Sequence, residues 1–173
     1  MPISLGQLDA AAGRQRPQRI AKSLNEAVAR RAQTAFLCHS HHDDRLAGGL
    51  QTFLAENGWD VYLDWQDSTM PSEPNRETAD RIKQKVRALD WFLFLATPNS
   101  TESRWCPWEI GYADHEKQHG KILLIRTTDE NNRYYGNEYL QLYAEIAATN
   151  LPNKWAVFPE DKVKGGVLLE NLR

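Results

Sequence analysis

The sequence predicts an open α/β fold, in which a parallel β-sheet carries helices on both faces. Two observations lead to this prediction. Short apolar runs that are typical of buried strands recur at residues 34–40, 59–65, 91–97 and 121–127. Amphipathic segments with helical spacing separate these runs. Strands that alternate with helices place parallel strands side by side in one sheet.

The elements follow in order along the chain. The strand TAFLCHS precedes the helix DDRLAGGLQTFLAENG. Gly58 ends this helix, and Ser40 and Asp43 match an S-x-x-D capping box at its start. The strand WDVYLDW leads through a polar loop to the helix TADRIKQKVRALD. The strand WFLFLAT leads through the loop PNSTESRWCPWE into a helix that runs to Gly120. KILLIRT is the fourth strand, EYLQLYAEIAA is expected to be a helix, and KWAVF is a short fifth strand.

The first 33 residues differ from the rest of the chain. The stretch QRIAKSLNEAVARRAQ places Ile20, Leu24 and Val28 at helical spacing among basic residues, which predicts a basic amphipathic helix. We therefore divide the chain into a helical leader, 1–33, and a domain, 34–173. The leader either packs on the domain or docks on a partner or a second copy.

Composition restricts the classes of function. The 173 residues suffice for one domain, and a formal net charge of −2 gives no general attraction to nucleic acid or to an anionic membrane. No apolar run approaches the length of a membrane span, and the N-terminus has no apolar core of the signal-peptide type. The two cysteines lie in dissimilar contexts, and Cys38 is expected to pack as a small apolar residue. These observations favour a cytoplasmic protein.

Polar residues gather where three of the strands end. His39 and Ser40 follow the first strand, Asp64 closes the second, and residues 103–109 follow the third. In an open parallel sheet the ligand site lies beyond the carboxyl ends of the strands, where the strand order reverses. The sequence therefore predicts that these residues share one site.

The stretch FLCHSHHDDRLAGGLQTFLAENGWDVYLDWQDSTMP, followed by SRWCPWEIGYAD, resembles a bacterial TIR (Toll/interleukin-1 receptor) domain over residues 34–160. It is similar to stand-alone, NAD-cleaving TIR proteins of the Thoeris type. The resemblance implies a flavodoxin-like sheet of five parallel strands in the order 2-1-3-4-5. It also implies cleavage of NAD+ at the nicotinamide–ribose bond.

By this resemblance, Glu109 is the catalytic carboxylate, and Trp105 is the first residue of the W-x-x-x-E signature. Asp64 matches the aspartate that closes the second strand, and His39 and Ser40 fall where the family's first loop lines the nucleotide site. Residues 66–77 match the BB loop, a segment that the family uses in gating and self-association. The chain departs from the family here, because Thr69 and Met70 precede Pro71 where an Arg or Gly is frequent.

The chemistry of NAD+ cleavage fits these residue types. Nicotinamide leaves NAD+ as a neutral base, so one carboxylate that stabilises an oxocarbenium-like transition state suffices. Glu109 is expected in the first turn of a helix, where an ionised carboxylate is favoured, and Trp105 and Trp108 are placed to hold a pyridinium by cation–π attraction. The structural alternatives are a helix-start acid for Glu109, core packing for both tryptophans and a helix cap for Ser40.

The sequence does not decide between two products: attack by water gives ADP-ribose, and attack by the adenine ring gives a cyclic ADP-ribose isomer. We expect NAD+ as the substrate, no further cofactor, self-association through TIR surfaces, and a separate effector protein that senses the product in antiphage defence. The alternative is a non-catalytic TIR–TIR adaptor.

A second motif points to different chemistry. His115, Glu116 and His119 form a literal H-E-x-x-H, the zinc-protease pattern. The pattern is expected at the end of its helix, next to polar residues and at the opposite edge of the sheet from the predicted site. We therefore expect no metal there, and we interpret His39, His41 and His42 as a solvated loop.

Overall fold

The computed structural model describes residues 1–18, 20–64, 75–118, 120–160 and 165–172. Its strands are β1 Ile3–Ser4, β2 Gln33–Cys38, β3 Val61–Asp64, β4 Trp91–Ala96, β5 Ile122–Thr128, β6 Ala144–Ala148, β7 Trp155–Phe158 and β8 Val167–Leu168. Its α-helices are α1 Leu5–Ala12, α2 Leu24–Ala29, α3 Asp44–Glu56, α4 Arg76–Ala88, α5 Pro98–Glu102 and α6 Cys106–Glu116. Three 3₁₀ turns complete the described elements: η1 His41–Asp43, η2 Glu138–Leu142 and η3 Leu169–Asn171.

One sheet runs through the molecule in the order β3-β2-β4-β5-β6-β7-β8, and β1 adds to β5. The strands from β3 to β6 are parallel to their neighbours, whereas β7 and β8 are antiparallel. The predicted order is confirmed for the first four strands that the sequence identified, and the predicted fifth strand, β7, comes next but is separated from β5 by β6. The sheet is larger than five strands, and its last two strands are not parallel.

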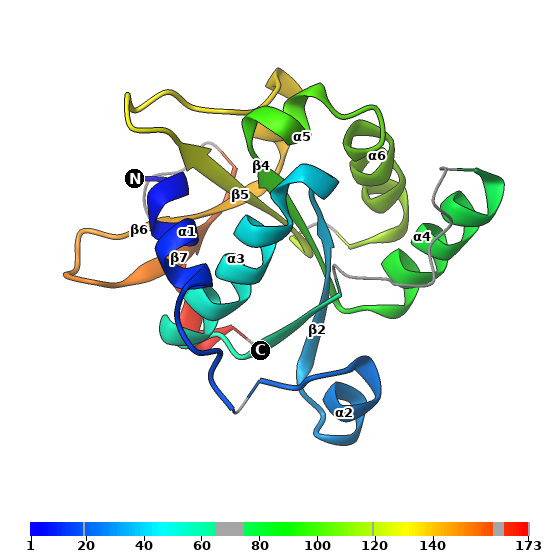
Figure 1. Ribbon diagram of the computed structural model, residues 1–173, viewed down its shortest axis with the longest axis horizontal. Helices are drawn as coiled ribbons and strands as arrows, with labels where there is room; N and C mark the ends of the chain where they lie inside the picture. Colours follow the sequence, from blue (N-terminus) through cyan, green and yellow to red (C-terminus); the bar gives the residue numbers. More distant parts are fainter. Residues whose placement is uncertain (19, 65–74, 119, 161–164, 173) are drawn as a thin grey trace.

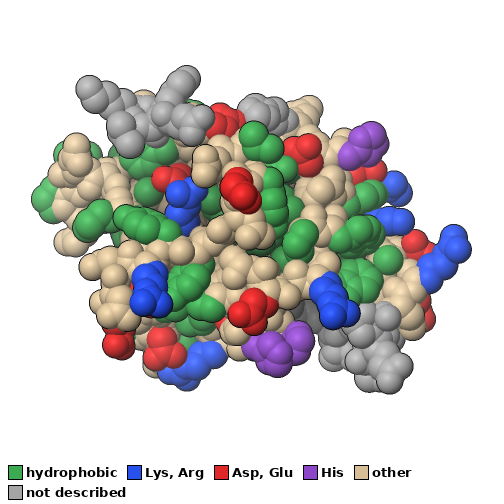
Figure 2. Space-filling view, turned by 90° about the horizontal axis from the view of Figure 1, so that it is seen from above, with side chains coloured by type: hydrophobic (Ala, Val, Ile, Leu, Met, Phe, Trp, Pro, Cys, Tyr) green, Lys and Arg blue, Asp and Glu red, His purple; other side chains and the backbone are tan. Residues whose placement is uncertain are grey.

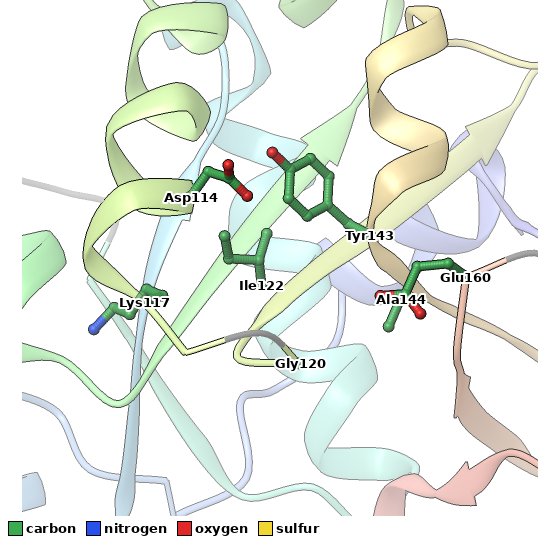
Figure 3. Close-up of a pocket in the computed structure, with 7 residues that line it drawn as sticks. All are labelled: Asp114, Lys117, Gly120, Ile122, Tyr143, Ala144 and Glu160. Atoms are coloured by element: carbon green, nitrogen blue, oxygen red, sulfur yellow. The ribbon is translucent and has the colours of Figure 1, made fainter.

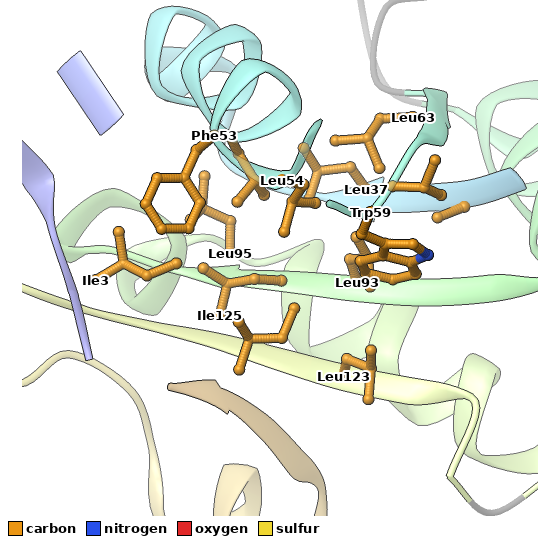
Figure 4. Packing of buried hydrophobic residues seen from close by; sticks show 14 of the residues in the cluster. Ile3, Leu37, Phe53, Leu54, Trp59, Leu63, Leu93, Leu95, Leu123 and Ile125 are labelled. Atoms are coloured by element: carbon orange, nitrogen blue, oxygen red, sulfur yellow. The ribbon is translucent and has the colours of Figure 1, made fainter. Parts of the chain in front are cut away.

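Helices cover the sheet on both faces (Figure 1). On one face, α1 and α3 lie over a core that includes Leu37, Leu54, Leu93 and Ile125, part of which is shown in Figure 4. On the other face, a second core joins strand residues such as Phe94 to Ile82 of α4 and Ile110 of α6. The two cores use alternate residues of the same strands, as the period of two requires. None of the helices in the described ranges is long and apolar enough to cross a membrane.

The segment EYLQLYAEIAA was predicted as a helix, and that prediction is wrong. It forms the turn η2 and then β6, which pairs with β5 through Leu123 and Ala144. A short apolar run such as AEIAA is compatible with a helix or with a strand, and the open edge of β5 favours the strand. The inserted β6 is also the reason why the predicted fifth strand, β7, is antiparallel.

The N-terminal segment also differs from its prediction. The expected helix shrinks to α2, which Ser23 caps by accepting a hydrogen bond from the backbone of Glu26. Val28, expected on the buried stripe, is 65% exposed. Residues 3–12 instead add a strand and a helix to the domain, and Ile3 and Leu8 are fully buried in the first core. The division of the chain at residue 33 stays a prediction.

The helix α1 packs closely on α3 because Gly49 has no side chain. A Cβ at this position would lie 2.0 Å from the carbonyl oxygen of Leu8. The predicted end of α3 is confirmed, since Gly58 follows it with φ +93°, a conformation that glycine adopts without strain. The predicted capping box is wrong: Ser40 accepts from the backbone of His42 and caps η1, so the turn η1 intervenes before α3 begins.

Candidate active site

The site lies beyond the carboxyl ends of β2, β3 and β4, where the strand order reverses. Asp64 of β3 pairs in register with Phe36 of β2, and Cys38 of β2 pairs with Phe94 of β4. Phe36, Cys38 and Phe94 belong to the core beneath α4 and α6, so Asp64 faces the same side of the sheet. Figure 2, which views the molecule from above Figure 1, shows charged side chains of both signs among hydrophobic ones.

Glu109 occupies the first turn of α6 and is buried, with 7% of its surface exposed. Its backbone N–H donates to the carbonyl of Trp105 at 2.9 Å, which sets the start of the helix. Burial raises the pKa of the Glu109 carboxyl from 4.5 to about 7, and a hydrogen bond from the Cys38 thiol opposes this shift. Because the site removes water from the carboxyl, its charge interacts strongly with any cation that enters.

The helix start that carries Glu109 is capped from outside the helix. The cap position, Trp105, makes no side-chain cap. The hydroxyl of Ser103 accepts instead from the backbone N–H groups of Trp105 and Cys106, at 3.2 and 3.3 Å. The carboxyl of Glu109 is therefore not used as a cap, which leaves it available for a ligand.

The two tryptophans lie together on α6. The Trp105 and Trp108 rings meet edge to face with centroids 5.4 Å apart, and Trp108 stacks on Tyr112 at 6.0 Å. Trp105 packs against the second core, whereas Trp108 is 37% exposed and has the Lys83 ammonium 5.8 Å from its ring centre. Trp105 is thus the tryptophan held between core and site, and Trp108 already has a cation over its ring.

Asp64 is buried at the end of β3 and pairs with Lys85 of α4 at 3.0 Å. This pair ties the strand to the helix on the side of the sheet that carries Glu109. His39 lies elsewhere: its Nδ1 is 3.0 Å from the carbonyl of Leu37, and its Nε2 is 3.4 Å from Asp44 at the start of α3. Ser40 is buried in its local cap. The structure therefore gathers Glu109, Asp64 and Trp105 on one face and directs His39 toward α3.

Two residues at this edge were not singled out as site residues from the sequence. Asp43 is 2% exposed, and its carboxylate accepts from the hydroxyl of Thr97 at 2.5 Å and from the amide of Asn99 at 2.6 Å. It thereby joins the segment after β2 to α5, which follows β4. Cys38 was taken for a small apolar residue, but its Sγ lies 3.9 Å from the backbone carbonyl of Cys106, at the start of the helix that carries Glu109. Only the packing of β2 on α6 reveals that contact.

The predicted BB loop falls almost wholly outside the described residues, since 65–74 are not described. Its last three residues are described. Asn75 caps α4 in a reciprocal capping box with Thr78. The role of the loop in gating and self-association stays a prediction.

The H-E-x-x-H segment lies at the other end of α6. The helix was expected to run to Gly120 but ends at Glu116, and His119 lies outside the described residues. Glu116 accepts from the hydroxyl of Tyr112 at 2.8 Å and from Arg87 at 3.1 Å, so its carboxylate joins α6 to α4. Among the residues that the structure describes, no three His, Cys, Asp or Glu side chains are grouped to hold a metal ion.

A small cavity near this end of the helix is too small for a dinucleotide. It measures about 60 Å³, and Figure 3 shows Asp114 of α6 and Lys117, which follows the helix, on one side and Tyr143 and Glu160 on the other. Burial, together with the nearby Asp114 carboxylate, raises the pKa of Tyr143 to about 12.

The fold and the site define an open α/β protein of flavodoxin-like topology, with a buried carboxyl group at its topological switch point. Comparison with known families identifies it further. The chain belongs to the TIR domain family, whose profile matches residues 35–155.

Two relatives are similar to this chain. It is 35% identical over 120 residues to a protein of Bacillus cereus (strain MSX-D12) named "Probable 3' cyclic ADP-D-ribose synthase ThsB'", an alignment that covers 68% of this chain and 62% of that protein. It is 22% identical over 143 residues to human Toll-like receptor 6, covering 80% of this chain and 17% of the receptor. The chain thus spans less than two-thirds of either relative.

Proposed function

We propose that this protein cleaves NAD+ at the nicotinamide–ribose bond, as an NAD+ glycohydrolase or ADP-ribosyl cyclase. The observation that carries the proposal is the buried Glu109 carboxyl in the first turn of α6, one turn after Trp105 and at the carboxyl edge of the sheet. The similarity to the Bacillus cereus protein, whose name describes a cyclic ADP-ribose synthase, supports the same class of substrate.

The chemistry assigns one main task to the protein. The nicotinamide of NAD+ is a cationic pyridinium that leaves as a neutral base, so cleavage needs no general acid. The positive charge moves onto the ribose ring in the transition state. An ionised Glu109 beside the ribose stabilises this charge, and it does so strongly because the surroundings exclude water. The Trp105 ring offers a face to the departing pyridinium.

The protonation of Glu109 is matched to this task. With a pKa of about 7, close to half of the carboxyl groups are ionised at pH 7 in the free protein. A bound pyridinium favours the ionised form, because an opposite charge nearby lowers the pKa of a carboxyl group. NADH carries a neutral dihydronicotinamide, so it neither favours this form nor provides a comparable leaving group.

The finer assignments are parts of the same proposal. Asp64, held by Lys85, contacts the ribose or the nicotinamide amide, and Trp108, Ser40 and His39 border the nucleotide. The product is ADP-ribose or a cyclic ADP-ribose isomer that serves as a signal in antiphage defence. A separate effector senses it, the protein works in the cytoplasm, and TIR surfaces, including the BB loop, bring copies together.

The competing proposal is a non-catalytic TIR–TIR adaptor, which the similarity to a Toll-like receptor and the partly exposed Trp108 support. Product analysis by chromatography coupled to mass spectrometry decides between the two. Purified protein is incubated with NAD+ or with NADH, beside Glu109→Gln and Glu116→Gln. Glu116 is a matched control, because it lies two turns further along the same helix and would be the base of the zinc motif.

We expect nicotinamide release from NAD+ alone, its loss by at least ~10³-fold in Glu109→Gln, and near-normal release in Glu116→Gln. Normal turnover in a folded Glu109→Gln variant would refute the mechanism. A comparable loss in Glu116→Gln would show that the effect is not specific to the Glu109 carboxyl. An absence of release at every protein concentration would favour the adaptor.

A further inference from the structure

The segments that follow β2 and β4 are joined by one buried side chain. Asp43 is 2% exposed, and both oxygens of its carboxylate accept hydrogen bonds: Oδ2 from the hydroxyl of Thr97 at 2.5 Å and Oδ1 from the amide of Asn99 at 2.6 Å. A buried carboxylate is costly unless donors face it, and hydrogen bonds to an ionised acceptor are roughly twice as strong as neutral ones. The burial of Asp43 therefore depends on α5 being in the position that supplies these donors.

Asp43 also holds the segment to which it belongs. Its backbone N–H donates to the carbonyl of Ser40 at 2.8 Å, which closes the turn η1. The hydroxyl of Ser40 accepts from the backbone N–H of His42 within the same turn. One side chain thus connects the turn that carries Ser40 to the start of α5.

The other end of this bridge leads to Glu109. Thr97 caps α5, a helix of five residues, which is too short to be stable without tertiary contacts. Directly after α5, the hydroxyl of Ser103 accepts from the backbone N–H groups of Trp105 and Cys106, at the start of α6. The position of α5 therefore sets where α6 begins, and with it the place of the Glu109 carboxyl.

We propose that Asp43 is a positioning residue, whose carboxylate locks the turn that carries Ser40 to α5 and so holds Glu109 in place against the bound nucleotide. The inference rests on the proposed NAD+ cleavage for its catalytic meaning. Small displacements matter for such a group, because an error of about 1 Å can cost ~10²-fold in rate. The bridge itself exists apart from that activity, so the two can be tested separately.

The test breaks the bridge from both ends. Asp43→Asn replaces the charged acceptor, and Asn99→Ala removes one donor from a half-buried position, so that this variant carries the test if Asp43→Asn does not fold. Ser100→Ala is the matched control. It removes a buried hydroxyl from the same helix start, one that bonds to the backbone of Thr97 instead of to Asp43.

Three quantities are measured on each protein. They are kcat and KM for nicotinamide release from NAD+, the free energy of unfolding in urea, and amide hydrogen exchange by NMR. The amides of interest are the hydrogen-bonded N–H groups of Trp105, Cys106 and Glu109, and the amides of β4 are the internal reference.

In Asp43→Asn and Asn99→Ala we expect exchange at the start of α6 to become ~10-fold faster relative to β4. We expect kcat to fall by ~10-fold, and by more than any change in KM, because the reacting geometry is lost rather than binding. In Ser100→Ala, kcat stays within about 2-fold although the free energy of unfolding falls. The double variant of Asp43 and Asn99 loses less than the product of the two single losses, because both changes break one bridge.

Unchanged exchange at these amides in the folded bridge variants would overturn the inference, even if nicotinamide is released normally. Faster exchange with unchanged kcat would also overturn it, and so would an equal loss of kcat in Ser100→Ala, which would make the stability of α5 alone responsible. Faster exchange in variants of a protein that releases no nicotinamide at all would leave the bridge in place and overturn its catalytic purpose together with the proposed function. The two failures are therefore distinguishable.

Discussion

Replacement of Glu109 by Gln changes how the stability of the protein depends on pH, and the structure supplies the magnitude. Burial raises the pKa of this carboxyl from 4.5 to about 7, so the folded protein binds the proton more tightly than the unfolded chain does. This contribution to stability is complete below pH 4.5 and is lost as the pH rises through 7. With one pKa unit equal to about 1.4 kcal/mol, the loss between pH 5 and pH 8 is about 2.5 kcal/mol.

Glutamine cannot ionise, so the Glu109→Gln variant escapes this loss. We expect its free energy of unfolding, relative to that of the unmodified protein, to rise by about 2.5 kcal/mol between pH 5 and pH 8. Urea denaturation followed by tryptophan fluorescence at four pH values measures the difference. Glu102→Gln changes an exposed glutamate in α5 and serves as the control, for which the difference should not vary with pH. If the difference in the free energy of unfolding for Glu109→Gln is also independent of pH, Glu109 is not the buried, proton-binding carboxyl described above.

Three further changes test the framework around the site. Asp43→Asn weakens the hydrogen bonds that Thr97 and Asn99 donate to this side chain, and it should lower the free energy of unfolding by about 2 kcal/mol in urea denaturation. An unchanged midpoint would show that these hydrogen bonds contribute little to stability. Gly49→Ala forces a methyl group against the backbone of α1 and should lower the free energy of unfolding by about 2 kcal/mol or more, which is measured as a lower Tm. An unchanged Tm would mean that α1 shifts easily to make room for the methyl group. Lys85→Met leaves Asp64 buried without its cation and should lower the free energy of unfolding by about 2 kcal/mol in urea denaturation; an unchanged midpoint would contradict the pairing.

The positions of the main strands and of two helices follow from local pattern alone. The strands β2, β3, β4 and β5 are apolar runs of the expected length, and α3 and α4 carry apolar residues at helical spacing. The rule that sites lie at the carboxyl ends of parallel strands then selects the segments that follow β2, β3 and β4, and the resemblance to TIR domains singles out Glu109 among them. These features are predictable because neighbouring residues determine them.

Other features depend on contacts between distant parts of the chain. Residues 144–148 become β6 because β5 offers an open edge, and residues 5–12 become a helix that packs on α3 because Gly49 leaves room for it. His39 and Cys38 are adjacent in the sequence, yet alternation along the chain turns the first toward α3 and the second toward α6.

The amino-acid sequence by itself therefore indicated the strands of the sheet's core, and its resemblance to TIR domains implied their order and pointed to Glu109 as the carboxylate at their edge. Only the tertiary structure decided what surrounds that carboxylate. The raised pKa of Glu109 arises from burial, and the core around its helix includes Cys38 of β2, about seventy residues earlier in the chain. Local propensities carry no information about such contacts, because desolvation and hydrogen bonding act through space.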